Sequence, residues 1–430
     1  MSHRIPPAQP IPANLPPNDL PSPHNEGLPE QPPTLKHDDY YTAGQFALIK
    51  RRFAKNWLGV AAAWFLFILV FVGFFAPFFS PVDPTIRGAN SDYKRGAPQG
   101  IHFADENEFS WRPFVYTYTK KQAEVDFSTI ASGDLSALDA LTNSGALSSS
   151  SQNEYIIDKD QRRYVYFFVK GWEYSLVNLG FFEIKWDRHL FGVKDGQIHL
   201  FGTDEDGKDV FSRTLHAIWI TVSIAIVALI FKLITSLLVG GISGYFGGRV
   251  DQVLMSITEA IRVIPSIPIY LACAVALSQF DLTPVQRYFA IAMIIGMLDF
   301  AALARRLRTH ILTERTQDYI LAAQLCGSST RRIIGKHLIP SFTSYIIVDT
   351  LINFPYVILA ETSLSFLGLG LTEPVNSLGV LLQKAQDPDI QQNMVWQFLP
   401  VSVFIVLILA FVFVGDALRD AADPYSERKG

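Results

Sequence analysis

The chain has 430 residues, of which 49% are hydrophobic, 13% are aromatic and only 18% are charged. Soluble proteins carry roughly 25% charged residues on average, so this composition argues against a purely soluble protein. The net charge of −4 does not point to a nucleic-acid partner, and none is expected. The two cysteines, Cys273 and Cys326, lack metal-ligand spacing, and we expect neither a metal site nor a disulfide.

The first segment, residues 1–40, is dominated by proline. Eleven of the 25 prolines fall within residues 1–35, which leaves too few backbone donors and too little apolar surface to fold. The segment also lacks the apolar core of a cleavable signal peptide. We predict a disordered cytoplasmic tail, with a Pro-rich partner-binding segment as the alternative.

Residues 41–79 form an amphipathic lead-in followed by the first transmembrane helix. Trp57–Phe79 contains no charged residue. At about 1.5 Å per residue this helix extends about 34 Å, enough to cross a hydrocarbon core of about 30 Å. The basic residues just before it predict a cytoplasmic start; they are Lys50, Arg51, Arg52 and Lys55.

Residues 80–211 are too polar to enter lipid, and this topology places them outside the membrane. A Ser/Ala/Leu-rich stretch, Ser128–Gln152, reads as a mobile loop. Alternating runs near Arg163–Lys170 and Phe181–Trp186 are typical of strands. We expect a small external α/β insert of two or three short strands with a helix.

Five further apolar segments form a five-helix core over residues 212–418, and with the first helix they make an all-α membrane protein of six transmembrane helices. The third span is broken by Pro265 and Pro268, and a polar loop at residues 305–341 follows the fourth. The boundaries are good to a few residues only. The five segments are about Ala217–Gly241, Val253–Leu277, Arg287–Ala304, Phe342–Leu367 and Phe398–Val414.

The distribution of basic residues predicts the orientation of this core. Loop 305–341 and the tail 419–430 are rich in arginine and lysine, whereas the loop 368–397 has only Lys384. By the positive-inside rule, the N-terminus, loop 305–341 and the C-terminus are all cytoplasmic. The basic residues of the loop are Arg305, Arg306, Arg308, Arg315, Arg331, Arg332 and Lys336.

The loop from Asp318 to Ser341, DYILAAQLCGSSTRRIIGKHLIPS, reads as two short helices with a break. Gly327 suits the turn between them, and Pro340 is expected to stop the second helix before span five. Small side chains at Ala322 and Ala323 allow a partner surface to approach closely. Arg331 and Arg332 supply charge on one face, with Ile333 and Ile334 on the other.

This spacing resembles the motif of permease subunits of binding-protein-dependent ABC importers. That motif has two alanines, a glycine four residues later, and a Leu/Ile-Pro pair about twelve residues beyond. The family often has a glutamate before the alanines, where this chain has Leu321. Five segments between Gly202 and Pro424 are similar to the dipeptide and oligopeptide subgroup: GTDEDGKDVFSRTLHA, GYFGGRVDQVLM, RIIGKHLIPS, ETSLSFLGLGL and GDALRDAADP.

The resemblance implies a multi-pass subunit of a bacterial inner (plasma) membrane importer that is not itself an enzyme. A second permease, two cytoplasmic ATPases and a periplasmic binding protein would be its partners. The chain has no GxxxxGK[ST] motif, so ATP hydrolysis is expected on the partners and no cofactor here. The implied ATPase-coupling residues are Ala322, Ala323, Gly327, Arg331, Arg332, His337 and Pro340.

Polar groups inside the spans are candidates for a translocation path, because burying them in lipid is costly. We select Asp349, Asn353 and Pro355, the last as a kink. For Asp349, and for Asp299 near the end of span four, pairing between helices is the preferred interpretation. A structural role is preferred for Glu361.

The alternatives differ in class. A membrane-embedded enzyme would need a catalytic constellation, and no HExxH or GxSxG motif occurs. A secondary transporter would show inverted internal repeats, and none is recognisable. Within the importer interpretation, di- and oligopeptides are the expected cargo, with oligosaccharides, opine-like conjugates and nickel as alternatives.

Overall fold

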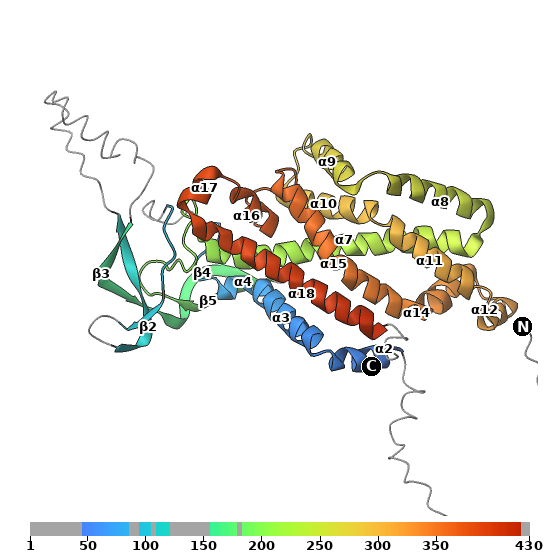
Figure 1. The fold of residues 1–430 in the computed structure, drawn as a ribbon, viewed down its shortest axis with the longest axis horizontal. Coiled ribbons are helices and arrows are strands. Elements are labelled where there is room, and N and C mark those ends of the chain that lie inside the picture. Colours follow the sequence, from blue (N-terminus) through green and yellow to red (C-terminus); the bar gives the residue numbers. More distant parts are fainter. Residues whose placement is uncertain (1–44, 86–93, 105–108, 121–154, 179–182, 423–430) are drawn as a thin grey trace, which may run out of the picture. The chain divides into compact units, whose positions relative to one another are not determined.

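The computed structural model describes residues 45–85, 94–104, 109–120, 155–178 and 183–422 (Figure 1). The predicted Pro-rich tail, the Ser128–Gln152 loop and the last eight residues lie outside the described residues. In the described part, the chain begins with α2 (Gln45–Lys55), α3 (Trp57–Phe74) and α4 (Ala76–Phe79). The Asn56 side chain caps α3 by accepting the Gly59 N–H at 3.0 Å. The first predicted span is therefore helical over its whole length, with one break at Phe75.

Four helices are long and apolar enough to cross a membrane, and two bent pairs raise the count to six if each pair is one span. The predicted six-span helical core is confirmed on that count. The single helices are α3, α7 (Val210–Phe246), α15 (Thr343–Phe366) and α18 (Leu399–Ala422). The pairs are α8 (Gly248–Val263) with α9 (Ser266–Leu277), bent by 89°, and α10 (Pro284–Leu298) with α11 (Ala301–Glu314), bent by 48°.

Two predicted boundaries are corrected by the helices. The break in span three lies at Pro265, whereas Pro268 sits in the first turn of α9, where a missing N–H leaves no intrahelical bond unmade. Residues 305–314 belong to α11 rather than to a loop, so the connector to span five begins at Arg315. The arginines that identified a cytoplasmic loop therefore lie on a helix.

Helix α7 is the central element of the helical core. It contacts α3, α10, α11, α15 and α16 (Leu378–Lys384). Gly240 and Gly244 allow α11 to pack closely. A Cβ added at Gly240 would lie 2.4 Å from the Ala304 carbonyl oxygen, and one added at Gly244 would lie 2.9 Å from the Arg308 carbonyl oxygen. Such small-xxx-small spacing is typical of close helix pairs in membranes.

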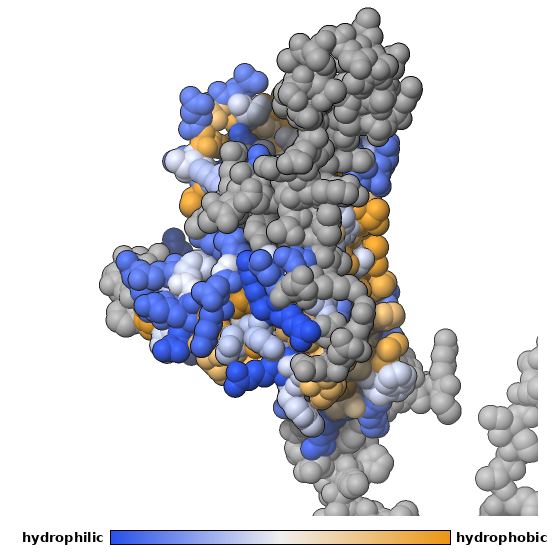
Figure 2. Space-filling model, turned by 90° about the vertical axis from the view of Figure 1, so that its left-hand side faces the viewer, coloured by the Kyte–Doolittle hydropathy of each residue, from blue (hydrophilic) through white to orange (hydrophobic). Residues whose placement is uncertain are grey.

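The described part of the insert forms two antiparallel sheets. β1 (His102–Ala104), β2 (Phe109–Lys120) and β3 (Tyr155–Tyr164) form one, and β4 (Tyr166–Asn178) and β5 (Glu183–Gly192) the other. Figure 2 looks onto this end of the chain, where the described surface is largely hydrophilic.

The insert departs from the prediction in strand number. Five strands are present where two or three were expected, and the run Arg163–Lys170 divides between β3 and β4 at Val165. Among the described residues between Ser80 and Asp209 there is no helix. Val165 is buried with Val115, Val193 and Ile198 in a small core of the insert. The chain leaves β3 at Tyr164 and enters β4 at Tyr166, so the run that was predicted as one strand contributes to two sheets.

The remaining short elements lie in the two connections that flank α15. The connector before it contains α12 (Asp318–Leu325), α13 (Thr330–Arg332), the π-helical turn η4 (Ile333–Leu338) and α14 (Ile339–Ser341). The connection after it contains α16, α17 (Pro388–Asn393) and the 3-10 turn η5 (Val395–Phe398). Much of the predicted loop 368–397 is therefore helical, in α16, α17 and η5.

Candidate functional site

The connector from Arg315 to Ser341 has the predicted form of two short helical stretches with a break. Gly327 ends α12 in the left-handed region, at φ +74°, which only glycine adopts without strain. The Ser328 N–H donates to the Ala323 carbonyl at 3.1 Å and closes the turn. An added Cβ at Gly327 would meet nothing within 4 Å, so backbone strain alone accounts for glycine within this chain.

The tip of the connector is exposed and apolar. Leu325 is 90% exposed, and Ala322, Cys326 and Gly327 are exposed around it, with Ala323 half-buried. Isolated exposed leucines are common, but this one lies in a row of small residues at the end of a short helix. The tip therefore combines small side chains with one fully exposed leucine.

The base of the connector is buried. Ile320, Ile333 and Leu338 are at most 1% exposed and pack into one cluster with Leu303 and Leu307 of α11. Burial of such side chains contributes roughly 1.5–3 kcal/mol each. The base of the connector therefore shares one packed core with α11.

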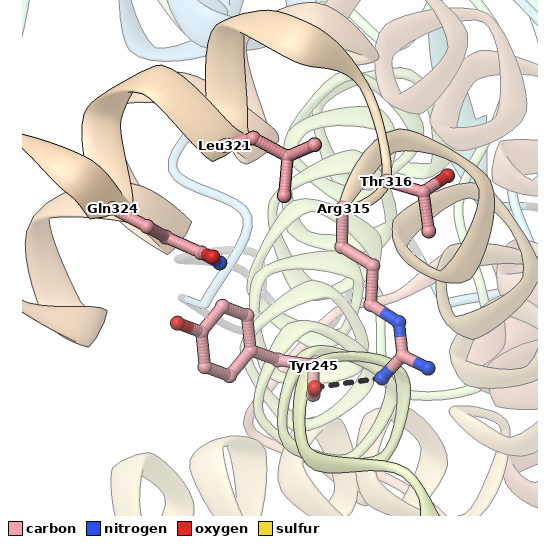
Figure 3. Close-up of a pocket in the computed structure, with 5 residues that line it drawn as sticks. All are labelled: Tyr245, Arg315, Thr316, Leu321 and Gln324. Carbon is pink, nitrogen blue, oxygen red and sulfur yellow. Dashed lines mark hydrogen bonds between the residues drawn. The ribbon is translucent and has the colours of Figure 1, made fainter.

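A pocket of about 470 Å³ opens beside α12 (Figure 3). It is lined by Tyr245 at the end of α7, by Arg315 and Thr316, and by Leu321 and Gln324 of α12. Arg315 Nη1 donates to the Tyr245 carbonyl at 2.9 Å and to that of Gly244 at 3.2 Å. A cation on the free carbonyls of a helix C-terminus is favourable, and it fixes the start of the connector to α7.

The other predicted coupling residues follow the tip. Arg331 and Arg332 are exposed and His337 is half-buried. Pro340 does not stop the helix as predicted: it lies inside α14, and the chain leaves helical geometry at Phe342, with φ −118° and ψ 17°. The preceding π-helical turn η4 has a wider hydrogen-bonding pattern, which accommodates a residue without an N–H.

A second group of charged side chains lies inside the helical core. Lys232 of α7 forms an ion pair with Asp299, at the α10–α11 junction, and its Nζ donates to Asn353 Oδ1 at 3.2 Å. Asn353 Nδ2 donates to Asp349 Oδ2 at 3.1 Å, and Arg306 Nη2 lies 2.6 Å from Asp349 Oδ1. The structure thus places Asp299 and Asp349 in interhelical pairs, the interpretation preferred from the sequence.

The predicted path residues separate in the structure. Asn353 lines a cavity of about 440 Å³ between α9, α10 and α15. Asp349 is buried away from it, and Pro355 is buried within α15. Sequence reasoning missed Ser266 and Tyr270 of α9, which also line this cavity; the Pro265 break just before them was the available signal.

Sequence reasoning also missed the role of the α11 arginines. Arg308 forms a bidentate ion pair with Asp251 of α8, whose carboxylate also accepts the Ser243 hydroxyl. Arg305 pairs with Glu259 on the same helix. Together with the pair between Arg306 of α11 and Asp349 of α15, these pairs attach α11 to two neighbouring helices. Their signal in the sequence was positive charge, which the topology rule had already explained.

Comparisons with known proteins agree with this architecture. Residues 236–427 match the family described as binding-protein-dependent transport system inner membrane component. Residues 44–98 match the N-terminal TM domain of oligopeptide transport permease C. The two matched segments contain five of the six candidate spans and part of α7.

Three curated relatives illustrate the similarity. The oligopeptide transport system permease protein OppC of Lactococcus lactis subsp. lactis (strain IL1403) is 30% identical over 60% of this chain and 84% of the relative. The dipeptide transport system permease protein DppC of Lactococcus lactis subsp. cremoris (strain MG1363) is 34% identical over 54% of this chain and 66% of its own length. The oligopeptide transport system permease protein OppC of Haemophilus influenzae is 35% identical over 53% of this chain and 70% of its own length.

The matches and the helices together define the class of protein. A chain with several apolar helices that matches an inner membrane component is a multi-pass inner membrane protein. The family consists of transport permeases and is not known for enzymes. The chain therefore belongs to the inner membrane components of binding-protein-dependent transport systems, in the dipeptide and oligopeptide permease branch.

Proposed function

We propose that this chain is the transmembrane subunit of an ATP-driven importer of di- and oligopeptides. It forms the translocation path with a second, homologous permease, and a periplasmic binding protein delivers the cargo. Two cytoplasmic ATPases bind the connector through the tip around Leu325. Both termini and the connector are cytoplasmic, and the insert is periplasmic.

The observation that carries the proposal is the contrast within the connector. Its tip exposes an apolar Leu325, at 90%, while its base is as buried as the interior of the helical core. A partner bound at the tip would cover Leu325 together with the exposed Ala322 and Gly327 beside it. The buried base supplies the mechanical link that a coupling element needs.

ATP hydrolysis is assigned to the partners. Residues 202–208, GTDEDGK, approach a phosphate-binding loop in spacing, but Asp209 stands where Ser or Thr would hold the magnesium ion. Two backbone amides of this loop are already engaged by a carboxylate. The N–H groups of Asp206 and Lys208 donate to Asp204 Oδ1 at 2.9 and 2.8 Å, respectively. Phosphate would meet negative charge there.

The force would pass from the tip to the helices through α11. The α12 base packs on α11, and α11 is attached to α8 by Arg308 and to α15 by Arg306. Closure of the ATPases on the tip would therefore move α8 and α15, which line the internal cavities. The cargo is assigned from the relatives, two of which are named for oligopeptide and dipeptide transport.

Copurification tests the coupling proposal. Gly327→Leu forces a left-handed backbone angle on a residue with a Cβ, at a cost of about 1–2 kcal/mol, and adds bulk to the tip. Gly335→Leu is the matched control, since Gly335 also has nothing within 4 Å of an added Cβ but has no left-handed angle. We expect the ATPase to be lost from the purified complex with Gly327→Leu and retained with Gly335→Leu. Equal retention in both variants would contradict the proposed contact.

A further inference from the structure

Two adjacent cavities lie at the breaks in the helix pairs. The larger, of about 440 Å³, and the smaller, of about 280 Å³, share the lining residues Ser266, Tyr270 and Asp299. Ligand pockets typically measure about 300–1,000 Å³. Non-helical backbone at membrane depth is tolerated where it lines a cavity, and here both breaks do so.

Asp299 presents a carboxylate oxygen to these cavities. Its Oδ2 is paired with Lys232, whose side chain is only 3% exposed. Lys232 Nζ also donates a hydrogen bond to Asn353 Oδ1. The Asp299 side chain remains 39% exposed. Within the described residues, Oδ1 has no hydrogen-bond partner. The lysine engages one oxygen of the carboxylate, and Asp299 lines both cavities.

Arg262 supplies the opposite charge. It lies in the last turn of α8 and lines the smaller cavity together with Asp299. The two carboxylates of α8, Asp251 and Glu259, are already paired with Arg308 and Arg305. Across the described part of the chain, Arg262 has no ion pair or hydrogen bond. Of the two α8 arginines, Arg249 and Arg262, only Arg262 lines either cavity.

The walls between these charges are mostly apolar or aromatic, with the polar side chains of Ser266, Asn353 and Ser363 among them. Ile267, Ile295, Tyr356 and Leu298 line one cavity or the other. Among the described residues that line the two cavities, Asp299 is the only carboxylate and Arg262 the only basic side chain. Ionisable residues at this depth mark transport pathways more often than they stabilise a fold.

We propose that the two cavities form a transit site for short zwitterionic peptides. Asp299 Oδ1 accepts a hydrogen bond from the peptide α-ammonium, and the Arg262 guanidinium donates to the α-carboxylate. The aromatic and aliphatic walls take the peptide side chains without selecting among them. The inference rests on the proposed function and adds to it the groups of the cargo that are recognised, namely the two termini.

Such a site would recognise the two charged termini that all short zwitterionic peptides share. An ammonium and a carboxylate are present whatever the sequence, and each charge-assisted hydrogen bond is stronger than a neutral one. A neutral sugar lacks both groups, so the site would not hold it. Broad peptide transport follows from recognition of termini, with side chains left to apolar surface.

The test uses the complete importer in proteoliposomes, with ATP, binding protein and radiolabelled trialanine as the probe. We expect Asp299→Asn and Arg262→Gln each to lower trialanine import about tenfold, the effect of one lost hydrogen bond to a charged group. ATP hydrolysis stimulated by the loaded binding protein should stay within about twofold of the wild-type rate. Asp299→Glu should restore part of the import.

Matched controls come from the same region. Arg249→Gln removes an exposed arginine of α8, and Asp281→Asn an exposed aspartate beyond α9; neither lines the cavities, and both should import normally. As a second measurement, a carbodiimide should join the trialanine amine to Asp299 in the loaded complex, as detected by mass spectrometry.

Three results would overturn the inference. If Asp299→Asn and Arg262→Gln both import trialanine at the wild-type rate, the proposed transit site is wrong, but the proposed function is not contradicted. Equal losses of import and of ATP hydrolysis would make the two residues structural. If the wild-type importer hydrolyses ATP but moves no trialanine, the proposed peptide function fails, and the transit site fails with it.

Discussion

At the scale of single residues, Glu373 holds a cluster of charges at the N-terminal end of α7. Its carboxylate accepts from Lys208 Nζ at 2.7 Å, Arg213 Nη2 at 2.6 Å and Lys384 Nζ at 2.5 Å. Arg213 is fully buried and is also paired with Asp204. The cluster thereby joins the end of the insert to α7 and α16.

The pKa of Glu373 makes this cluster sensitive to acid. Burial alone would raise that pKa, but the hydrogen bonds from Lys208 and Lys384 and the charge of Arg213 outweigh it and lower the pKa to about 2, from an ordinary value of 4.5. A lowered pKa contributes stability above the unfolded-state value, and the contribution is lost as pH falls from about 4.5 toward about 2. With 31% of the side chain exposed, screening limits it to about 1 kcal/mol.

Glu373→Gln tests this contribution. We expect the variant to unfold at lower temperature than the wild type near pH 7, because the carboxylate's ion pairs are lost. The difference should shrink as pH approaches 2, where the wild-type carboxylate also becomes neutral. Thermal unfolding of the purified complex across this range measures it. A difference that does not change with pH would contradict the assigned role.

The sequence identifies polar residues inside spans but not their partners. Asp299, Asp349 and Asn353 were recognisable because each interrupts an apolar run. Lys232 was visible only as the single charge in span two, and it lies 67 positions from Asp299 and 121 from Asn353. Pairing over such distances depends on how helices pack, which hydropathy does not specify.

At the scale of elements, α11 joins the connector at residues 315–341 to the cavity walls. The Arg308–Asp251 pair is the best enclosed of its attachments to α8, with side chains 29% and 15% exposed. The Arg305–Glu259 pair is more open, at 39% and 60%. Exposed pairs contribute roughly 0–1 kcal/mol, whereas hydrogen bonds to partly buried charges contribute about 1.5–3 kcal/mol.

Arg308→Ala should therefore uncouple the transporter. We expect peptide import per ATP hydrolysed to fall about tenfold, since about 1.4 kcal/mol of the attachment is lost. The ratio is measured by following import and phosphate release in the same proteoliposomes. Arg305→Ala, on the same helix, is the control and should keep a ratio near wild type. Equal ratios for wild type and Arg308→Ala would exclude α11 as the link.

Elements were predictable where one physical property dominates. The spans follow from apolar length, and the connector break follows from Gly327. Helix α11 was assigned in part to a loop because its arginines satisfy the positive-inside rule equally well on a helix. The strands of the insert were undercounted, because β-strand pairing such as Phe114 with Tyr164 depends on contacts between distant residues.

At the scale of the whole molecule, the proposed orientation places Cys326 inside the cell. Cys326 is exposed at the connector tip, whereas Cys273 is half-buried in α9. In a Cys273→Ser background, with ATPases stripped by urea, a membrane-impermeant maleimide should label Cys326 in inverted vesicles. Right-side-out vesicles should remain unlabelled. Labelling of right-side-out vesicles alone would reverse the topology.

We propose that this chain moves peptides only when partner ATPases drive it. Reconstitution tests this dependence, with trialanine import measured in proteoliposomes that lack one component at a time. We expect import only when this chain, the second permease, the ATPases, the binding protein and ATP are all present. Import of trialanine by this chain in the absence of any ATPase would contradict it.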